Sequence, residues 1–185
     1  MKLILLRHED RENYPGFLSN ITREGFNNTI KLENKLKKLK IDIIYSSPFI
    51  RTLQTIYWYC IKNNKKVNME FSISEYRHNI YFLFENIIYD LNLIPNELNK
   101  IINDDYKSFL KNDNLSLLEN NTSLKKRVNK FIQKLIKNKD LKNKNILIVS
   151  HKAVLNMIKQ QFINKNVEIK DDFNRGTFEI YNIKQ

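Results

Sequence analysis

The chain has 185 residues, 42% of them hydrophobic, which is enough for one domain with a core and excludes wholesale disorder. Three Gly and three Pro exclude a collagenous or linker-rich organisation. The net charge of +12 would suit an anionic partner, but 25 of the 32 basic residues are Lys, and we expect A/T-rich codon usage to supply much of that charge.

The N-terminal part predicts a strand, a turn and a helix. Residues 2–6 (KLILL) form a short apolar run suited to a buried strand, and Pro15-Gly16 predicts a turn. Thr22 is a suitable N-cap, so we expect a helix to begin after it. The apolar stripe expected along this helix is formed by Phe26, Ile30, Leu32, Leu36 and Leu39.

Two further strands and a helix are expected next. Residues 41–45 (IDIIY) predict a second strand, and residues 67–71 (VNMEF) a third, shorter one. Between them, Pro48 suits the first turn of a helix over about 48–61.

The second half of the chain continues the alternation. The stretch 80–118 is aromatic and rich in asparagine, and we expect helical pieces in it. A helix over about 121–138 leads into 145–149 (NILIV), a strong candidate for a buried strand. Another helix follows His151, and residues 177–183 alternate like a half-exposed edge strand.

This order predicts an α/β fold, a three-layer sandwich whose mostly parallel central sheet is flanked by helices. We expect one domain over residues 1–185, with 80–118 as a small helical insertion. The apolar run Leu3 to Leu6 is far shorter than the roughly 20 residues of a membrane span, and no signal peptide is visible, so we expect a cytoplasmic protein without a membrane partner. Cys60 is the one cysteine, and no Cys/His spacing suits a structural zinc site.

Three polar clusters each follow the end of a predicted buried strand. They are Arg7-His8, Ser46-Ser47-Pro48 with Arg51 one turn later, and Ser150-His151. In open parallel sheets ligands bind at the carboxyl ends of strands, so we expect the clusters to converge. Two imidazoles and two guanidiniums there would suit a dianionic phosphoryl group, which a neutral imidazole can attack.

Each cluster taken alone also has a plain structural interpretation. His8 or His151 would be packed histidines, and Arg51 would be a solvated helix residue. Their recurrence at strand ends, in a chain with three His and seven Arg, favours a site. Arg is informative here because Lys is the easier outcome of the codon bias and lacks the planar two-pronged donor.

At this point the sequence resembles the histidine phosphatase superfamily, in its phosphoglycerate mutase-like branch. The matching segments are LLRH at 5–8, ITREG at 21–25, YSSPFIRTLQT at 45–55 and ILIVSH at 146–151. The resemblance implies a metal-independent phosphomonoesterase without a cofactor, in which His8 is the phosphorylated nucleophile. It further implies that the phosphoryl group is held by Arg7, Arg51 and His151, and that Glu75 is the proton donor.

Four acidic residues compete for the role of proton donor, namely Glu75, Glu9, Asp10 and Glu12. In-line displacement needs the nucleophile and the acid on opposite sides of phosphorus, which disfavours Glu9 beside His8. Glu75 follows the third strand and can approach across the pocket, where a bound phosphate dianion would raise its pKa and keep it protonated.

The chain departs from the family after each histidine, where Glu9 and Lys152 replace the usual glycines. Glu9 would repel a phosphate unless its side chain points away, and Lys152 would attract anions or be solvated. Possible substrate contacts are Arg11, His78 and Lys152, although Arg11 equally suits a solvated loop and His78 a surface position.

Two other functions remain open in the sequence. The first is a phosphoglycerate-type mutase, but the resemblance implies arginines in the inserted segment of such enzymes, and no Arg occurs between Arg77 and Arg127. The second is a non-catalytic module that binds a phosphorylated ligand. We expect a phosphorylated small molecule or phosphoprotein as substrate and not nucleic acid, because the lysines are spread along helices rather than interleaved with aromatic residues.

Overall fold

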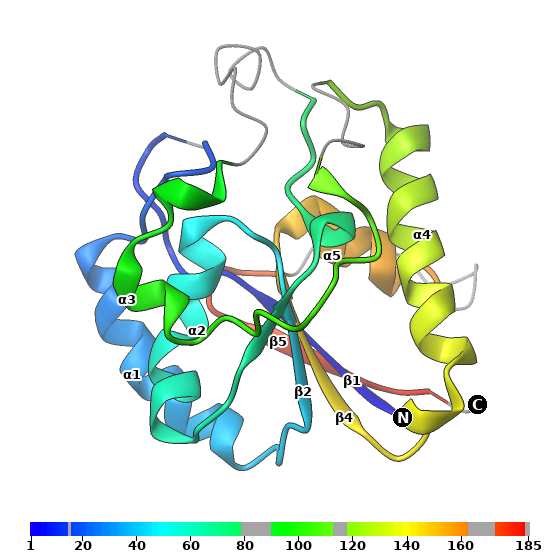
Figure 1. Cartoon of the computed structure of the whole chain (residues 1–185), viewed down its shortest axis with the longest axis horizontal. Coiled ribbons are helices and arrows are strands. Elements are labelled where there is room, and N and C mark those ends of the chain that lie inside the picture. Colours follow the sequence, from blue (N-terminus) through cyan, green and yellow to red (C-terminus); the bar gives the residue numbers. More distant parts are fainter. Residues whose placement is uncertain (15, 79–89, 113–117, 163–172, 184–185) are drawn as a thin grey trace.

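The structure is a computed structural model that describes residues 1–14, 16–78, 90–112, 118–162 and 173–183. Within these residues the chain forms a five-stranded sheet in the order β3-β2-β4-β1-β5 (Figure 1). The strands are β1 (Lys2–Arg7), β2 (Ile43–Ser46), β3 (Val67–Met69), β4 (Asn145–Ser150) and β5 (Phe178–Asn182). Strands β1 to β4 pair in parallel, and β5 pairs antiparallel with β1 at one edge. The expected mostly parallel sheet and its edge strand are confirmed.

Helices cover both faces of this sheet, which confirms the predicted sandwich. Helices α1 (Arg23–Lys37) and α2 (Ile50–Lys62) lie on one side, and α4 (Asn121–Lys137) and α5 (Lys152–Lys159) on the other (Figure 1). Among the described residues, no helix is both long and apolar enough to cross a membrane.

The stretch 80–118, which we expect to be an insertion, is described over residues 90–112, where it contains a 3₁₀ turn at Leu91–Leu93 and the short helix α3 (Asn96–Asn99). Helix α3 packs beside α2. The expectation for the rest of 80–118 lies outside the described residues at 80–89 and 113–117, as does Pro15 of the predicted turn.

The sheet is buried because its central strands are apolar on both faces. Along β1, Ile4 and Leu6 join the core under α1 and α2, whereas Leu3 and Leu5 join the core under α4 and α5. Continuous apolar runs such as these are typical of strands that helices cover on both sides.

The predicted apolar stripe of α1 is wrong at two positions, because Phe26 and Ile30 are 44% exposed. The buried face of the helix is formed by Gly25, Thr29, Leu32, Glu33 and Leu36. Helix α1 approaches the first loop closely at Gly25, where a Cβ would lie 2.6 Å from the carbonyl oxygen of Asp10. This close approach turns the small residues inward and Phe26 outward, against the edge of Trp58.

Strand β3 is shorter than predicted and ends at Met69. The carboxylate of the following Glu70 accepts a hydrogen bond of 2.8 Å from the backbone N–H of Ser72, and the chain turns into a 3₁₀ helix at Phe71–Ile73. Helix α2 likewise begins two residues later than predicted, after Phe49 in the N-cap position.

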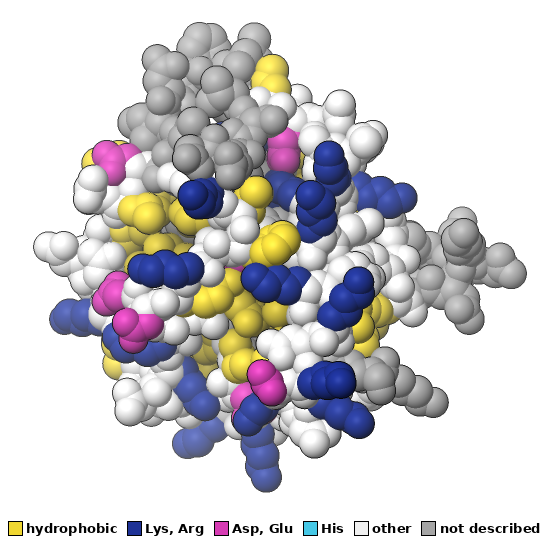
Figure 2. All heavy atoms as spheres, turned by 45° about the vertical axis from the view of Figure 1, so that its right-hand side comes forward, with side chains coloured by type: hydrophobic (Ala, Val, Ile, Leu, Met, Phe, Trp, Pro, Cys, Tyr) yellow, Lys and Arg dark blue, Asp and Glu magenta, His cyan; other side chains and the backbone are white. Residues whose placement is uncertain are grey.

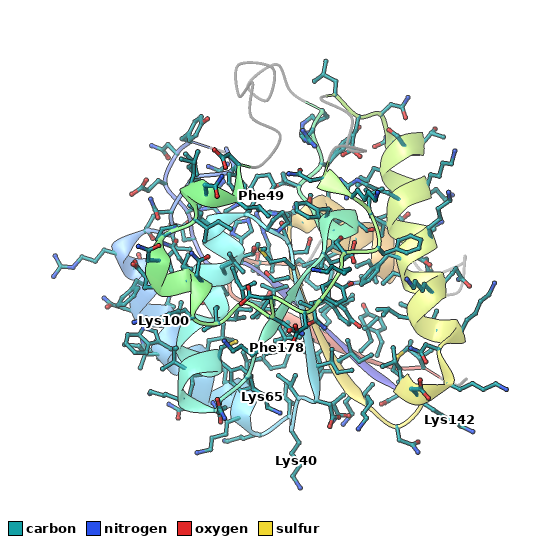
Figure 3. The ribbon with its side chains drawn as sticks, viewed as in Figure 1. Lys40, Phe49, Lys65, Lys100, Lys142 and Phe178 are labelled. Atoms are coloured by element: carbon teal, nitrogen blue, oxygen red, sulfur yellow. The ribbon has the colours of Figure 1, made fainter. Side chains whose placement is uncertain are left out.

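The parallel strands end at the same edge of the sheet, which is where the polar motifs emerge. Phe49, which follows β2, lies toward this edge, whereas Lys40 and Lys142, which precede β2 and β4, point away from the opposite edge (Figure 3).

Candidate active site

His8 immediately follows β1 and is buried, with 2% of its surface exposed. Its Nδ1 lies 2.7 Å from the backbone carbonyl oxygen of Glu9. A carbonyl only accepts, so Nδ1 carries the proton and Nε2 keeps its lone pair. Burial, followed by the nearby charges of His151 and Arg51, lowers the pKa of His8 well below 6.5. His8 is therefore a neutral imidazole at neutral pH.

His151 follows β4 as the N-cap residue of α5 and is fully buried. Its Nε2 lies 2.8 Å from Oγ of Ser47, and its Nδ1 lies 3.2 Å from Oε2 of Glu75. Burial lowers the pKa of His151 to about 4, although Glu75 opposes that shift. The rings of His151 and His8 meet edge to face, with centroids 5.2 Å apart.

Arg51, in the first turn of α2, is fully buried and contacts His151, which follows β4. Its NH1 donates a hydrogen bond of 2.7 Å to the carbonyl of Gly16. Its NH2 lies 3.2 Å from Oε2 of Glu75 and 3.3 Å from Nδ1 of His151. The guanidinium also lies over the ring of Phe49, 4.4 Å from its centroid, so its orientation is fixed from several sides.

Glu75 comes from the segment after the 3₁₀ turn, and 22% of its side chain is exposed. Burial raises its pKa, but its contacts with His151 and the charge of Arg51 outweigh burial and hold the pKa below the ordinary value of Glu. The carboxylate is thus ionised in this structure. The protonated state expected beside a bound phosphate requires a change in its surroundings.

These groups favour an anionic ligand over a metal ion. Among the described residues, His8, Glu75 and His151 are the one group whose potential ligand atoms all lie within 4.8 Å of one another. However, the guanidinium of Arg51 touches two of the three, and its fixed positive charge opposes a cation at the same place. Two neutral imidazoles and a buried guanidinium suit a phosphoryl group.

The remaining predicted site residues are Arg7, Arg11, Lys152 and His78. Arg7 ends β1, and its NH1 donates a hydrogen bond of 2.7 Å to the carbonyl of Phe173. Arg11 donates to the carbonyl of Glu12 at 2.6 Å. The other two are Lys152, the half-buried first residue of α5, and His78, which is exposed and stacks on the ring of Tyr76.

Glu9, the residue in place of the family glycine, is largely buried with its side chain against Gly176. Its carboxylate also receives a hydrogen bond from Asn28 in α1. The turn at Gly176 has a positive φ of 67°, and a Cβ there would collide with this carboxylate. Glu9 thus packs against α1 and the Gly176 turn.

Residues that the sequence analysis did not single out hold the Glu75 segment in place. Oγ of Ser150 donates a hydrogen bond of 2.7 Å to the carbonyl of Ile73. Arg127 of α4 donates to carbonyls on the same segment and pairs with Glu119. Its residue type is the feature of the sequence that could have identified Arg127, because only seven of the 32 basic residues are arginines.

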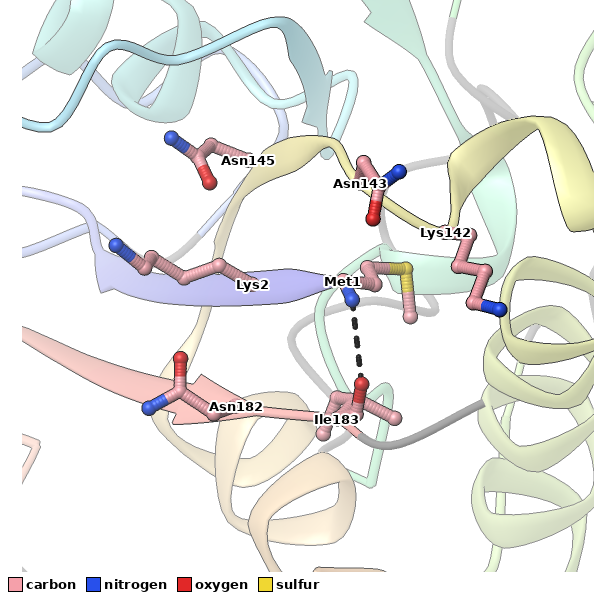
Figure 4. A pocket seen from close by; sticks show the side chains of 7 residues that line it. All are labelled: Met1, Lys2, Lys142, Asn143, Asn145, Asn182 and Ile183. Carbon is pink, nitrogen blue, oxygen red and sulfur yellow. Dashed lines mark hydrogen bonds between the residues drawn. The ribbon is translucent and has the colours of Figure 1, made fainter.

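Among the described residues, hollows also lie away from this cluster. One of about 330 Å³ is at the opposite end of the sheet, beside Met1, Lys2 and Asn145, where the N-terminal amine donates to the carbonyl of Ile183 (Figure 4). A second of about 540 Å³ is lined in part by Met69, Phe71, Ile102 and Tyr106. On the face shown in Figure 2, lysine and arginine side chains are scattered among hydrophobic and other polar ones.

Comparisons with known proteins bear on the family and the fold. A family model, histidine phosphatase superfamily (branch 1), matches residues 4–184. No curated protein matches the sequence significantly.

Three solved structures illustrate the likeness in fold. An alpha-ribazole phosphatase from Shigella flexneri has a TM-score of 0.66 and 19% identity, with 100% of this chain and 92% of that chain covered. An ecdysone phosphate phosphatase from Bombyx mori, in complex with tungstate, has a TM-score of 0.68 and 12% identity over 97% of this chain and 88% of that one. A phosphoserine phosphatase from Entamoeba histolytica, in complex with phosphoserine, has a TM-score of 0.57 and 24% identity over 87% and 79%.

Proposed function

The chain belongs to the histidine phosphatase superfamily, branch 1, and from this membership we propose that it is a phosphomonoesterase that transfers a phosphoryl group to His8 and then to water. Its substrate is a phosphorylated small molecule or a phosphoprotein. The observation that carries the proposal is the state of His8, whose Nδ1 is tied to the backbone at 2.7 Å and whose neutral ring lies beside Arg51 and His151. A neutral imidazole with one free nitrogen is the form that attacks phosphorus.

The reaction has two displacements at phosphorus. In the first, Nε2 of His8 attacks, the P–N bond forms, the P–O bond to the leaving alcohol breaks, and Glu75 gives that oxygen a proton. In the second, a water oxygen attacks phosphohistidine, the P–N bond breaks, and Glu75 takes the proton of the water. The hydrogen bond from Nδ1 to the carbonyl of Glu9 stabilises the positive ring of the intermediate.

Glu75 must acquire its proton before the first step, because its contacts with His151 and Arg51 keep it ionised. A phosphate monoester carries one proton below its second pKa of about 6. On binding, the phosphoryl oxygens compete with Glu75 for the guanidinium of Arg51, and their charge raises the pKa of the carboxyl. The proton then moves from the substrate to Glu75 and onward to the leaving oxygen.

Arg7, Arg51 and His151 hold the phosphoryl group and neutralise its charge in this scheme, so no metal ion is needed. Arg51 is the best supported of the three, because it is fully buried and already borders His151. Bidentate donation to phosphoryl oxygens is the role in which Lys does not replace Arg.

The test is a screen of phosphorylated metabolites and a phosphotyrosine peptide, in which phosphate release is measured for the wild type and His8→Ala. We expect hydrolysis of at least one substrate by the wild type and none by His8→Ala, with both proteins equally folded by circular dichroism. Turnover by His8→Ala at the wild-type rate would overturn the proposal.

A further inference from the structure

The segment that carries Glu75 lies outside the regular strands and helices and is held from one side by α4. Arg127, from the second turn of that helix, donates three hydrogen bonds to backbone carbonyls of this segment. NH1 donates to the carbonyl of Ser72 at 2.7 Å, and NH2 donates to those of Ser74 at 3.0 Å and Glu75 at 3.1 Å. The backbone of Glu75 is therefore fixed by a guanidinium that belongs to another element.

Glu119 completes this arrangement. Its two carboxylate oxygens lie 2.6 and 2.7 Å from Nε and NH2 of Arg127, and the two side chains are only 3% and 7% exposed. The backbone N–H of Glu119 donates to the carbonyl of Arg77 at 2.8 Å, and its Oε2 accepts from the N–H of Arg77 at 3.4 Å. The Arg127–Glu119 pair therefore forms hydrogen bonds with the backbone both before and after Glu75.

The carboxylate of Glu75 points to the other side, toward the catalytic cluster. Its Oε2 lies 3.2 Å from both Arg51 and His151, while its Oε1 accepts from the N–H of Tyr76 at 3.0 Å. Proton transfer requires the donor within hydrogen-bond reach of the leaving oxygen, and a misplacement of about 1 Å can cost about 10²-fold in rate. The hydrogen bonds from Arg127 to the backbone of this segment therefore determine the distance from the Glu75 carboxyl to the leaving oxygen.

Only an arginine can make this set of contacts. The guanidinium has five N–H donors in a rigid plane, whereas an ammonium has three on a flexible stem and is a point charge. Arg127 directs its donors to three carbonyls and one carboxylate at once. In a chain that uses Lys for 25 of its 32 basic residues, an arginine at this place has a specific task.

We propose that Arg127, held by Glu119, is a positioning residue that sets Glu75 at the distance needed for proton transfer to and from the reacting oxygen. This rests on the proposed role of Glu75 in hydrolysis. A buried ion pair by itself is weak support for stability, because desolvation offsets most of its Coulomb energy. The contacts with the Glu75 segment give this pair its function.

The experiment compares two substrates in Arg127→Lys. An alkyl phosphate has a poor leaving group that must be protonated, whereas 2,4-dinitrophenyl phosphate has one that leaves without a proton. For the alkyl phosphate we expect kcat to fall about 10- to 100-fold with KM little changed. The pre-steady-state burst of dinitrophenolate, which reports phosphorylation of His8, should stay within about twofold of the wild type.

The matched control is Lys159→Met in α5. Lys159 is a largely buried cation whose Nζ lies 2.8 Å from Oε1 of Glu179 in β5. This variant should change the melting temperature, but it should not slow the alkyl phosphate more than the dinitrophenyl phosphate. If Arg127→Lys folds poorly, Arg127→Met/Glu119→Met removes both charges together, which avoids an unpaired buried charge. That variant should show the same separation between substrates.

Combination with Glu75→Gln separates the possible failures. If Arg127 acts through Glu75, then Arg127→Lys adds less than about twofold to the loss already caused by Glu75→Gln. Multiplied losses, or an Arg127→Lys protein that is slowed equally on both substrates, would overturn the positioning role while leaving the proposed function intact. Equal slowing of both substrates by Glu75→Gln itself would overturn the assignment of the proton donor, and the positioning role with it.

Discussion

The pH dependence of alkyl phosphate hydrolysis should follow the proton of the substrate rather than that of Glu75. Oε2 of Glu75 lies 3.2 Å from the guanidinium of Arg51. At an effective dielectric constant of about 20 the Coulomb attraction to Arg51 is about 5 kcal/mol. Together with the contacts to His151 it outweighs the cost of burying the carboxylate, so the pKa of Glu75 is lowered and the carboxylate is ionised. Burial also lowers the pKa of His8 below 6.5 and that of His151 to about 4. Near neutral pH the free enzyme therefore has two neutral imidazoles and an ionised Glu75.

The consequence is a simple profile of kcat/KM. It should be level just below the second pKa of the ester, near 6, and fall about tenfold per pH unit above it. The fall reflects loss of the substrate monoanion, which brings the proton that Glu75 passes to the leaving group. A free histidine nucleophile with an ordinary pKa would instead make the rate rise with pH through about 6.5.

The assay compares ethyl phosphate with 2,2,2-trifluoroethyl phosphate, whose second pKa is lower, by phosphate release over the same pH range. The descending limb should shift to lower pH by the difference between the two second pKa values. A limb at the same pH for both esters would refute the reasoning, because a group of the enzyme would then carry the proton.

Three further outcomes are expected. EDTA should leave kcat unchanged, because side chains neutralise the phosphoryl group, and loss of activity that a divalent ion restores would contradict this. The free energy of unfolding should decrease as the pH is lowered from 6.5 to about 4, by up to about 1.4 kcal/mol per pH unit for each of His8 and His151. The reason is that these histidines bind protons in the unfolded chain but stay neutral in the folded protein over this range. Urea titrations measure it, and an unchanged slope in His151→Asn would contradict the cause. Gly176→Ala should lose about 1–3 kcal/mol of stability, because its φ of 67° and the carboxylate of Glu9 both oppose a Cβ. Glu9→Gly in the Gly176→Ala protein should restore part of the loss, and no restoration in thermal melting would contradict the clash.

The sheet and the gathering of polar motifs were within reach of the sequence because both depend on short-range patterns. An apolar run such as residues 145–149 can be buried in few ways, and the residue after it must emerge at the carboxyl edge. His151 and Arg51 could therefore be expected on the same edge without knowledge of the pairing order. Their contact at 3.3 Å follows from strand β2 lying next to β4.

What the sequence could not show depends on contacts between distant segments. The helical periodicity predicts Phe26 on the buried face of α1, but Phe26 is exposed. The close approach of Gly25 to Asp10 turns a different face of the helix toward the core, and no sequence pattern within α1 indicates that contact. Arg127 likewise lies in a lysine-rich helix, 52 residues from the Glu75 carbonyl to which it donates. The ionised state of Glu75 also depends on Arg51 and His151, which come from other elements.

The central claim is that the phosphoryl group is transferred to His8. The direct measurement uses Glu75→Gln with 2,4-dinitrophenyl phosphate, because the first step then needs no acid while the second lacks its base. Rapid quenching in base followed by mass spectrometry should find one phosphoryl group per chain, located on His8 and lost in acid. A burst of dinitrophenolate without a phosphoryl group on His8, or with one on another residue, would contradict the account.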